Sequence, residues 1–167
     1  LVKLNLDPNK NTLLVIGGSQ GAKSINNHFR NSYQKYLDKD IQIIWQVGIH
    51  SKELINKIKH KNIRIFEFID DMGLVYSASD IVVSRAGATA ISEILFLEKP
   101  SVLIPYPFAA NNHQEINGNV LSKAGASIIV KESEFYNGKL EDSIIDLVTS
   151  PVRMESYRHN ASKLSKK

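Results

Sequence analysis

A glycine-rich segment near the start of this 167-residue chain has the composition of a phosphate-binding loop. The apolar run Thr12–Ile16 is followed by G-G-S-Q-G-A at positions 17–22, and a helical pattern begins directly afterwards. Glycines adopt positive φ and let backbone amides approach a ligand closely. The helix start adds unpaired amides and the positive end of a dipole. The segment therefore predicts phosphate binding, with the Ser19 hydroxyl as a further donor; the alternative is a tight turn that needs glycine only for packing.

Two better-known nucleotide motifs fit this segment less well. A P-loop with Gly17 at its start and Lys23 on the phosphates would need glycine where the chain has Ala22. Its magnesium would also need an aspartate after a later strand, whereas Asp80 precedes its strand. The dinucleotide fingerprint G-x-G-x-x-G fails because the first two glycines are adjacent. A P-loop nucleotide hydrolase is therefore the less favoured alternative.

A second junction between a strand and a glycine-containing helix start follows the run Asp80–Val83. Its residues are S-R-A-G-A-T-A-I-S-E at positions 84–93. Two helix starts on one sheet edge could share a diphosphate. Glu93, about one turn into the expected helix, would gain from the helix dipole and could accept hydrogen bonds from a ribose diol. Taken alone, it also fits an ordinary solvated helix face. Arg85 could pair with phosphate or cap neighbouring carbonyls.

A third polar segment follows the prolines of Pro105–Pro107, which end a strand. Asn111 or Asn112 is expected to cap the next helix. The Gln114 amide both donates and accepts hydrogen bonds, which suits sugar hydroxyls. His113 could transfer a proton near neutral pH, but no acid or hydroxyl stands at the spacing of a catalytic triad.

Short Val- and Ile-rich runs that alternate with helical patterns must position these segments. The runs are Thr12–Ile16, Ile41–Val47, Ile63–Phe68, Asp80–Val83, Ser101–Ile104 and Ser127–Val130. Continuous apolar runs of this length are typical of parallel strands that are buried on both faces. Between them, stripes such as Ile25-Phe29-Tyr36 and Ile116-Val120-Leu121 predict helices. We therefore expect an α/β fold with a doubly wound, mostly parallel, Rossmann-like sheet of about six strands, which binds ligands at the carboxyl ends of its strands.

The composition bounds the class of protein. Hydrophobic residues make up 43% and charged residues 23%, which predicts one globular domain over residues 1–167 rather than a disordered chain. The absence of cysteine excludes disulfides and thiol chemistry, and no histidine spacing predicts a metal site. The net charge of +4 permits an anionic partner. A non-catalytic module whose basic tail binds nucleic acid or acidic lipid is the third hypothesis, although a solvated helix explains the tail better.

Six segments, in this order, resemble the donor-binding half of the MurG family. Its members are bacterial UDP-N-acetylglucosamine:undecaprenyl-diphospho-muramoylpentapeptide N-acetylglucosaminyltransferases. The segments are G-G-S-Q-G-A (17–22), F-I-D-D-M (68–72), D-I-V-V-S-R-A-G-A-T-A-I-S-E (80–93), P-Y-P (105–107), H-Q-E-x-N (113–117) and K-A-G-A (123–126). The resemblance extends from Thr12 to about Val148 and implies one half of a GT-B fold.

The resemblance also implies a site for UDP-N-acetylglucosamine. Ser19 and its loop would contact the diphosphate, Ile69 would meet the uracil through its backbone, Glu93 would bind the ribose and Gln114 the sugar hydroxyls. Some members of the family have another glutamine at the position of His113, so the resemblance assigns His113 no contact. The implied substrate-binding residues are Gly18, Ser19, Gln20, Phe68, Ile69, Met72, Ala88, Thr89, Ala90, Ile91, Ser92, Glu93 and Gln114.

The implied reaction is inverting transfer of N-acetylglucosamine to a lipid-linked muramoyl-pentapeptide, without metal or other cofactor and without a nucleic-acid partner. The resemblance places the general base, the acceptor site and the membrane contact in an amino-terminal domain. This chain, which begins at Leu1, would lack that domain, contain no catalytic residue, and bind donor while being inactive. The parent enzyme would lie in the bacterial cytoplasm, peripheral on the inner face of the membrane. A glycosyltransferase of the same fold with another acceptor is the alternative.

Overall fold

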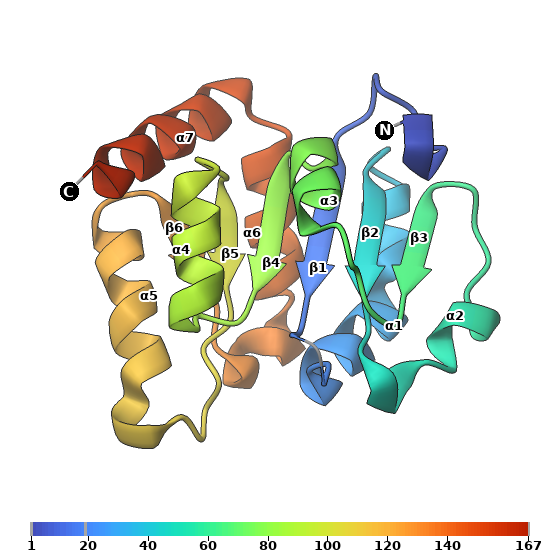
Figure 1. The fold of residues 1–167 in the computed structure, drawn as a ribbon, viewed down its shortest axis with the longest axis horizontal. Helices are drawn as coiled ribbons and strands as arrows, with labels where there is room; N and C mark the ends of the chain where they lie inside the picture. The colour runs from blue at the N-terminus through green and yellow to red at the C-terminus, as the bar shows by residue number, and fades with distance from the viewer. Residues whose placement is uncertain (1, 19, 167) are drawn as a thin grey trace. The chain divides into compact units, whose positions relative to one another are not determined.

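A computed structural model describes residues 2–18 and 20–166 of the chain (Figure 1). Its backbone contacts divide the chain into two compact units, Leu1–Asp80 and Ile81–Lys167. In both units parallel strands are packed against helices. The prediction that residues 1–167 form one donor-binding domain stays a prediction.

The first unit contains three strands within its described residues. β1 (Thr12–Ile16), β2 (Gln42–Gln46) and β3 (Ile63–Phe66) are parallel and lie in the order β3-β2-β1. Thr12 stands opposite Gln42, and Ile43 opposite Ile63. The helices are α1 (Lys23–Leu37), α2 (Leu54–Lys57) and α3 (Met72–Ala78), with single 3-10 turns η1 (Val2–Leu4) and η2 (Ile49–Ser51).

Helix α1 buries the apolar stripe that its sequence predicts. Ile25, Phe29 and Tyr36 are fully buried. The ring of Phe29 stacks on that of Tyr36 at 5.4 Å and lies 5.9 Å from the ring of Trp45 on β2. Burial of such large side chains stabilises a fold by roughly 1.5–3 kcal/mol each. This cluster therefore holds α1, and the glycine loop that leads into it, against the sheet.

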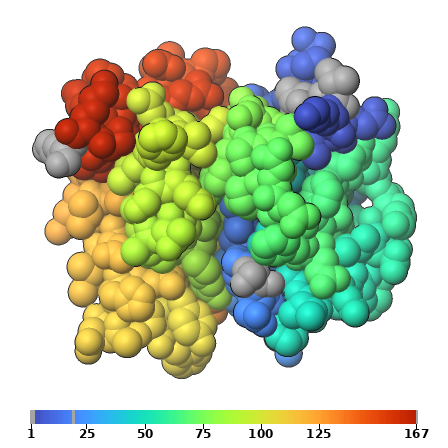
Figure 2. Space-filling model, viewed as in Figure 1, coloured from blue at the N-terminus to red at the C-terminus, as the bar shows by residue number. Residues whose placement is uncertain are grey.

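The second unit also contains three strands in the part that the structure describes. β4 (Ile81–Ser84), β5 (Ser101–Leu103) and β6 (Ser127–Ile129) are parallel in the order β4-β5-β6. The helical segments are α4 (Ala88–Phe96), η3 (Ala110–Asn112), α5 (His113–Lys123), η4 (Glu132–Asn137), α6 (Lys139–Val148) and α7 (Pro151–Ser165). Figure 1 shows α4 on the near face of these strands and α6 on the far face, and α4 and α5 lie side by side on the near face in Figure 2.

Helix α7 is a packed element of this unit. Ser150 caps its first turn by accepting a hydrogen bond from the Arg153 amide, and Pro151 occupies a first-turn position, where proline is favoured. Met154 and Ala161 are buried where α7 meets α4 and α6. The basic tail is therefore a docked helix with a solvated outer face, as its composition predicts.

The predicted fold class is confirmed, since all six apolar runs form parallel strands whose ends differ from the predicted ones by at most two residues. Burial on both faces holds for β1, β2, β4 and β5 but not for β3 and β6, which pair with a neighbour on one side only and are half-buried. None of the helices in the described residues is both long and apolar enough to cross a membrane.

Helix α5 differs from its predicted orientation. Ile116 and Val120 are 59% and 56% exposed, whereas the same helix buries Gly118 and Leu121. A Cβ atom on Gly118 would lie 3.2 Å from the Ile129 side chain. Because glycine lets the helix approach β6 this closely, its buried face runs through Gly118 and Leu121 and leaves Ile116 and Val120 exposed.

Candidate functional site

The loop after β1 has the backbone geometry that its glycines predict. Gly18 and Gly21 have φ values of +83° and +79°, and the Gly21 amide donates to the Gly18 carbonyl at 3.0 Å. A Cβ atom on Gly17 would lie 2.5 Å from the Ala22 nitrogen. Ala22 precedes α1 and makes no side-chain cap, so this N-cap residue leaves the first amides of the helix without the usual side-chain acceptor. This arrangement is the one that binds phosphate at helix starts.

The loop contains two further predicted contact residues, Ser19 and Gln20. Ser19 lies outside the described residues. Gln20 is exposed. The lysine of the P-loop alternative, Lys23, is the first residue of α1, and its side chain is also exposed.

The loop after β2 packs directly against the glycine loop. A Cβ atom on Gly21 would lie 2.1 Å from the Val47 carbonyl oxygen, and one on Gly48 would lie 2.2 Å from the Gly21 nitrogen. Gly48 itself has φ +76°. The two backbones therefore touch at a distance that only glycine permits on both sides.

Two buried amide side chains hold the segments around the glycine loop together, and neither was predicted. Gln46, at the end of β2, donates from Nε2 to the Gly18 carbonyl at 3.0 Å and accepts the Ile69 amide at Oε1, also at 3.0 Å. Asn26, on α1, donates from Nδ2 to the Val47 carbonyl at 2.7 Å and accepts the Trp45 indole N–H at 3.0 Å. A polar residue inside the apolar run Ile41–Val47 is the signal that could have pointed to Gln46.

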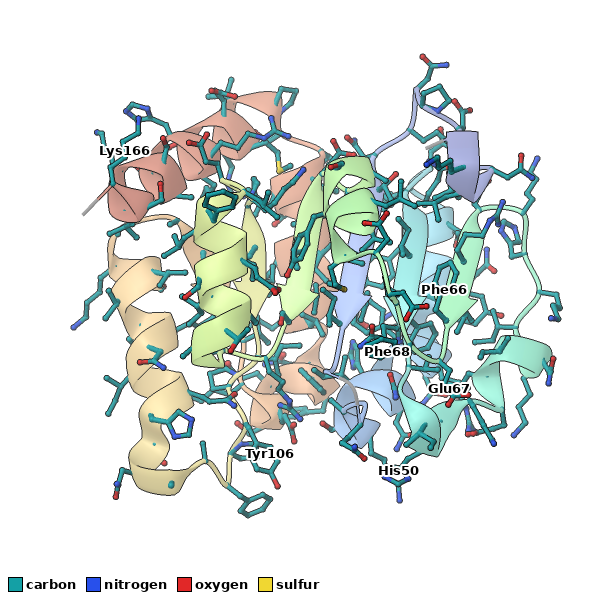
Figure 3. All side chains as sticks on the ribbon, in the orientation of Figure 1. His50, Phe66, Glu67, Phe68, Tyr106 and Lys166 are labelled. Atoms are coloured by element: carbon teal, nitrogen blue, oxygen red, sulfur yellow. The ribbon has the colours of Figure 1, made fainter. Side chains whose placement is uncertain are left out.

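The predicted base-binding residues follow β3. Phe68 is 56% exposed and lies beyond the carboxyl end of β3, on the same edge of this unit as His50 (Figure 3). Ile69 is buried, and Met72, at the start of α3, is half-buried. Asp71 caps α3 by accepting the Leu74 amide at 2.9 Å. An exposed aromatic ring beside a fixed backbone segment can pack on the face of a planar ligand.

The second unit repeats the uncapped helix start. Gly87 precedes α4 without a side-chain cap, and Ala88 and Thr89 are exposed at the first turn. Ala90 is half-buried. Ile91 is buried, and its amide donates to the Gly87 carbonyl at 3.0 Å. The groups of this turn that can meet a ligand are therefore the first amides and the exposed side chains of Ala88 and Thr89.

Farther along α4, Ser92 and Glu93 lie beyond the first turn. Ser92 is exposed, and its hydroxyl donates to the Ala88 carbonyl at 2.9 Å. Glu93 is half-buried and is the sixth residue of the helix. The expected gain from the helix dipole is therefore wrong for Glu93, because that effect fades within the first turn.

The amide of Gln114 has a defined orientation. Its Oε1 accepts the Tyr106 backbone amide at 2.9 Å, and its Nε2 lies 3.9 Å from the position that a Cβ atom on Gly87 would take. Gln114 therefore presents a donor toward the start of α4. Its neighbour His113 is exposed, with Nδ1 2.8 Å from the Ala110 carbonyl oxygen. The expected cap Asn112 precedes α5 in the left-handed conformation and makes no side-chain cap.

Arg85 supports the loop after β5. Its guanidinium pairs with Glu132 at 2.5 Å and lies 5.3 Å from the centre of the Tyr106 ring. It also lies 3.4 Å from the carbonyl oxygens of Ile104 and Pro105. Arg85 was expected either to pair with phosphate or to cap neighbouring carbonyls. Its contacts with the Ile104 and Pro105 carbonyls fit the second role.

Nearby charges form further pairs. The Lys131 ammonium lies 2.6 Å from the Glu115 carboxylate, and this hydrogen bond raises the pKa of Lys131. A hydrogen bond from Lys139 lowers the pKa of Glu134. Within the described residues, no three histidine, aspartate or glutamate side chains are grouped so that they could hold a metal ion.

Comparison with known proteins identifies the family. The model of the glycosyltransferase family 28 C-terminal domain matches residues 12–167. A UDP-N-acetylglucosamine--N-acetylmuramyl-(pentapeptide) pyrophosphoryl-undecaprenol N-acetylglucosamine transferase from Halalkalibacterium halodurans is 38% identical over 98% of the chain and 47% of its own length. The transferase of the same name from Bacteroides thetaiotaomicron is 38% identical over 99% of the chain and 46% of its own.

A solved structure agrees with these relatives. The crystal structure of Acinetobacter baumannii MurG has a TM-score of 0.75 and 25% identity, over 99% of this chain and 48% of that one. The chain thus spans about half the length of the relatives that it matches. On these grounds, the chain belongs to glycosyltransferase family 28 and corresponds to the C-terminal domain of that family.

Proposed function

We propose that the chain is the donor-binding part of an N-acetylglucosaminyltransferase and binds UDP-N-acetylglucosamine. The observation that carries the proposal is the loop of positive-φ glycines before the uncapped start of α1, in a chain whose relatives are named for this donor. The uncapped start of α4 supports it independently. Amides at helix starts stabilise diphosphate charge without a metal ion.

Each predicted binding residue keeps its role in this proposal. Gly18, Ser19 and Gln20 would surround the diphosphate, and Phe68, Ile69 and Met72 would hold the uracil. Residues 88–93 would line the nucleotide-sugar, with Glu93 on the ribose. Gln114 would bind an oxygen of the sugar through Nε2, because its Oε1 is already taken by Tyr106.

The reaction that this domain would serve is an inverting transfer. An acceptor hydroxyl attacks the anomeric carbon, the bond from that carbon to the β-phosphate oxygen breaks, and its electron pair leaves with UDP. The amides at the helix starts stabilise this developing charge. The relatives' name points to a lipid-linked muramoyl-pentapeptide as acceptor. We assign the acceptor, the base that takes the hydroxyl proton and the contact with the inner face of the bacterial membrane to the part of the relatives that this chain does not cover.

Calorimetric titration of the 167-residue chain tests donor binding. For UDP and for UDP-N-acetylglucosamine alike, we expect the affinity measured with magnesium to equal the affinity measured with EDTA. The reason is that backbone amides, and not a metal ion, contact the diphosphate in this proposal. Lys23→Ala is expected to change the affinity less than twofold, since the exposed Lys23 has no phosphate role in this proposal.

The opposite pattern would support the P-loop alternative. Magnesium-dependent binding of ATP or GTP, abolished by Lys23→Ala, would reject the glycosyltransferase proposal. Absence of any UDP signal from the folded chain would reject it as well.

Gln114→Leu is expected to weaken UDP-N-acetylglucosamine binding about tenfold and to change UDP binding less than twofold. The substitution keeps the side-chain volume but removes the donor Nε2, and a lost hydrogen bond of this kind is worth roughly 1 kcal/mol or somewhat more. The same titration with both ligands measures the difference. Equal losses for the two ligands would place Gln114 on the nucleotide instead of on the sugar.

A further inference from the structure

The side chain of Gln46 joins the two loops of the first unit that carry the predicted nucleotide contacts. Its Nε2 holds the Gly18 carbonyl of the glycine loop, and its Oε1 holds the Ile69 amide of the loop after β3, each at 3.0 Å. Only 3% of Gln46 is exposed. One buried amide group therefore fixes two segments that lie 51 positions apart in the sequence.

Both hydrogen bonds of Gln46 are made to backbone groups of residues to which the proposed function assigns a role in donor binding. Gly18 has φ +83° and accepts the Gly21 amide through the same carbonyl that Gln46 holds. Ile69 is the residue whose backbone is proposed to meet the base. Because Gly18 has no side chain to restrict its backbone, a partner that holds its carbonyl limits the conformations that the loop can adopt.

We infer that Gln46 is a positioning residue for donor binding, which sets the glycine loop and the loop after β3 in the arrangement that a nucleoside diphosphate requires. It touches no ligand atom in this role. Its contribution is preorganisation, since loops that are already ordered lose less entropy when the ligand binds. The inference rests on the proposed function.

The chain supplies a matched control on the same strand. Gln42 is also buried, and its amide is likewise engaged at both ends: Nε2 donates to the Asp7 carbonyl at 2.8 Å, and Oε1 accepts the Asp7 amide at 2.7 Å. Gln42 lies at the opposite end of β2 from the glycine loop. Gln42→Met and Gln46→Met therefore make the same change of side chain and each remove a donor and an acceptor bond to backbone; Gln42→Met also removes a 3.3 Å bond from Nε2 to the Thr12 hydroxyl.

The experiment compares the two variants by UDP titration and by urea unfolding. We expect both to lose stability to a similar extent. Gln46→Met is expected to weaken UDP binding at least tenfold, and Gln42→Met less than twofold. Amide hydrogen exchange provides a second readout: the Ile69 amide should exchange faster in Gln46→Met, and at the wild-type rate in Gln42→Met.

Gln46→Glu separates the two contacts and covers the case in which Gln46→Met does not fold. The carboxylate still accepts the Ile69 amide but cannot donate to the Gly18 carbonyl. We expect slow exchange at Ile69 together with UDP binding that is at least threefold weaker than in the wild type.

The outcomes are distinguishable. Equal loss of UDP affinity in the Gln42 and Gln46 variants, or no loss in either, would overturn the positioning role while leaving the proposed function intact. Absence of UDP binding by the wild-type chain would instead overturn the proposed function, and the positioning role with it.

Discussion

Gly21→Ala is expected to lower the free energy of unfolding by about 2–5 kcal/mol. The new Cβ atom would lie 2.1 Å from the Val47 carbonyl oxygen, so one of two backbones must move. Overpacking of this kind costs about 1–3 kcal/mol, and the left-handed conformation at φ +79° adds about 1–2 kcal/mol for a residue with a Cβ atom. Urea unfolding followed by circular dichroism measures the loss.

Gly18→Ala is the matched control for this prediction. Gly18 has a similar φ of +83°, but a Cβ atom there would meet nothing within 4 Å. The control therefore carries the conformational cost alone, about 1–2 kcal/mol. If the two variants were equally stable, the close packing between the glycine loop and the loop after β2 would have to be absent in solution.

Asn26→Ala is expected to lower the free energy of unfolding by about 2–4 kcal/mol. The substitution removes the acceptor of the Trp45 indole N–H and the donor to the Val47 carbonyl, both in a buried setting. A buried polar group left without its partner costs about 1–3 kcal/mol. Urea unfolding followed by circular dichroism is again the measurement.

The exposed neighbour Asn27 provides the comparison for Asn26. Asn27→Ala changes the same residue type on the same helix and is expected to alter the stability by no more than about 0.5 kcal/mol. A loss at Asn26 no larger than that at Asn27 would show that the hydrogen bonds of Asn26 do not hold α1 to β2.

The strands could be predicted from the sequence because each is marked locally. The run Thr12–Ile16 is apolar at every position after the first, is bounded by polar residues and glycine, and forms β1 with the same limits. The facing of α5 could not be predicted in this way. Its apolar residues Ile116 and Val120 suggest a buried stripe, but the approach to β6 is decided by Gly118, whose contribution is the absence of a side chain.

In the candidate site, too, features marked by adjacent residues could be predicted, and features that depend on distant residues could not. The glycine loop could be predicted because its conformational demands are written in adjacent residues. The support of that loop could not, because Gln46 and Gly48 contact it from the end of β2 and the loop that follows, nearly thirty positions away. Arg85 illustrates the intermediate case: its sequence context allowed two roles, and the position of Glu132, which no local pattern predicts, favours one.

The environment of Trp45 makes it an optical reporter of one part of the molecule. It is the single tryptophan of the chain, lies fully buried in the first unit and donates its indole N–H to Asn26. Its emission therefore follows the entry of water into the residues Leu1–Asp80, whereas circular dichroism follows the helices of both units. Unfolding curves from the two signals coincide only when the units unfold as one cooperative body. A single native fluorophore thus allows the thermodynamic independence of the two units to be measured without labelling.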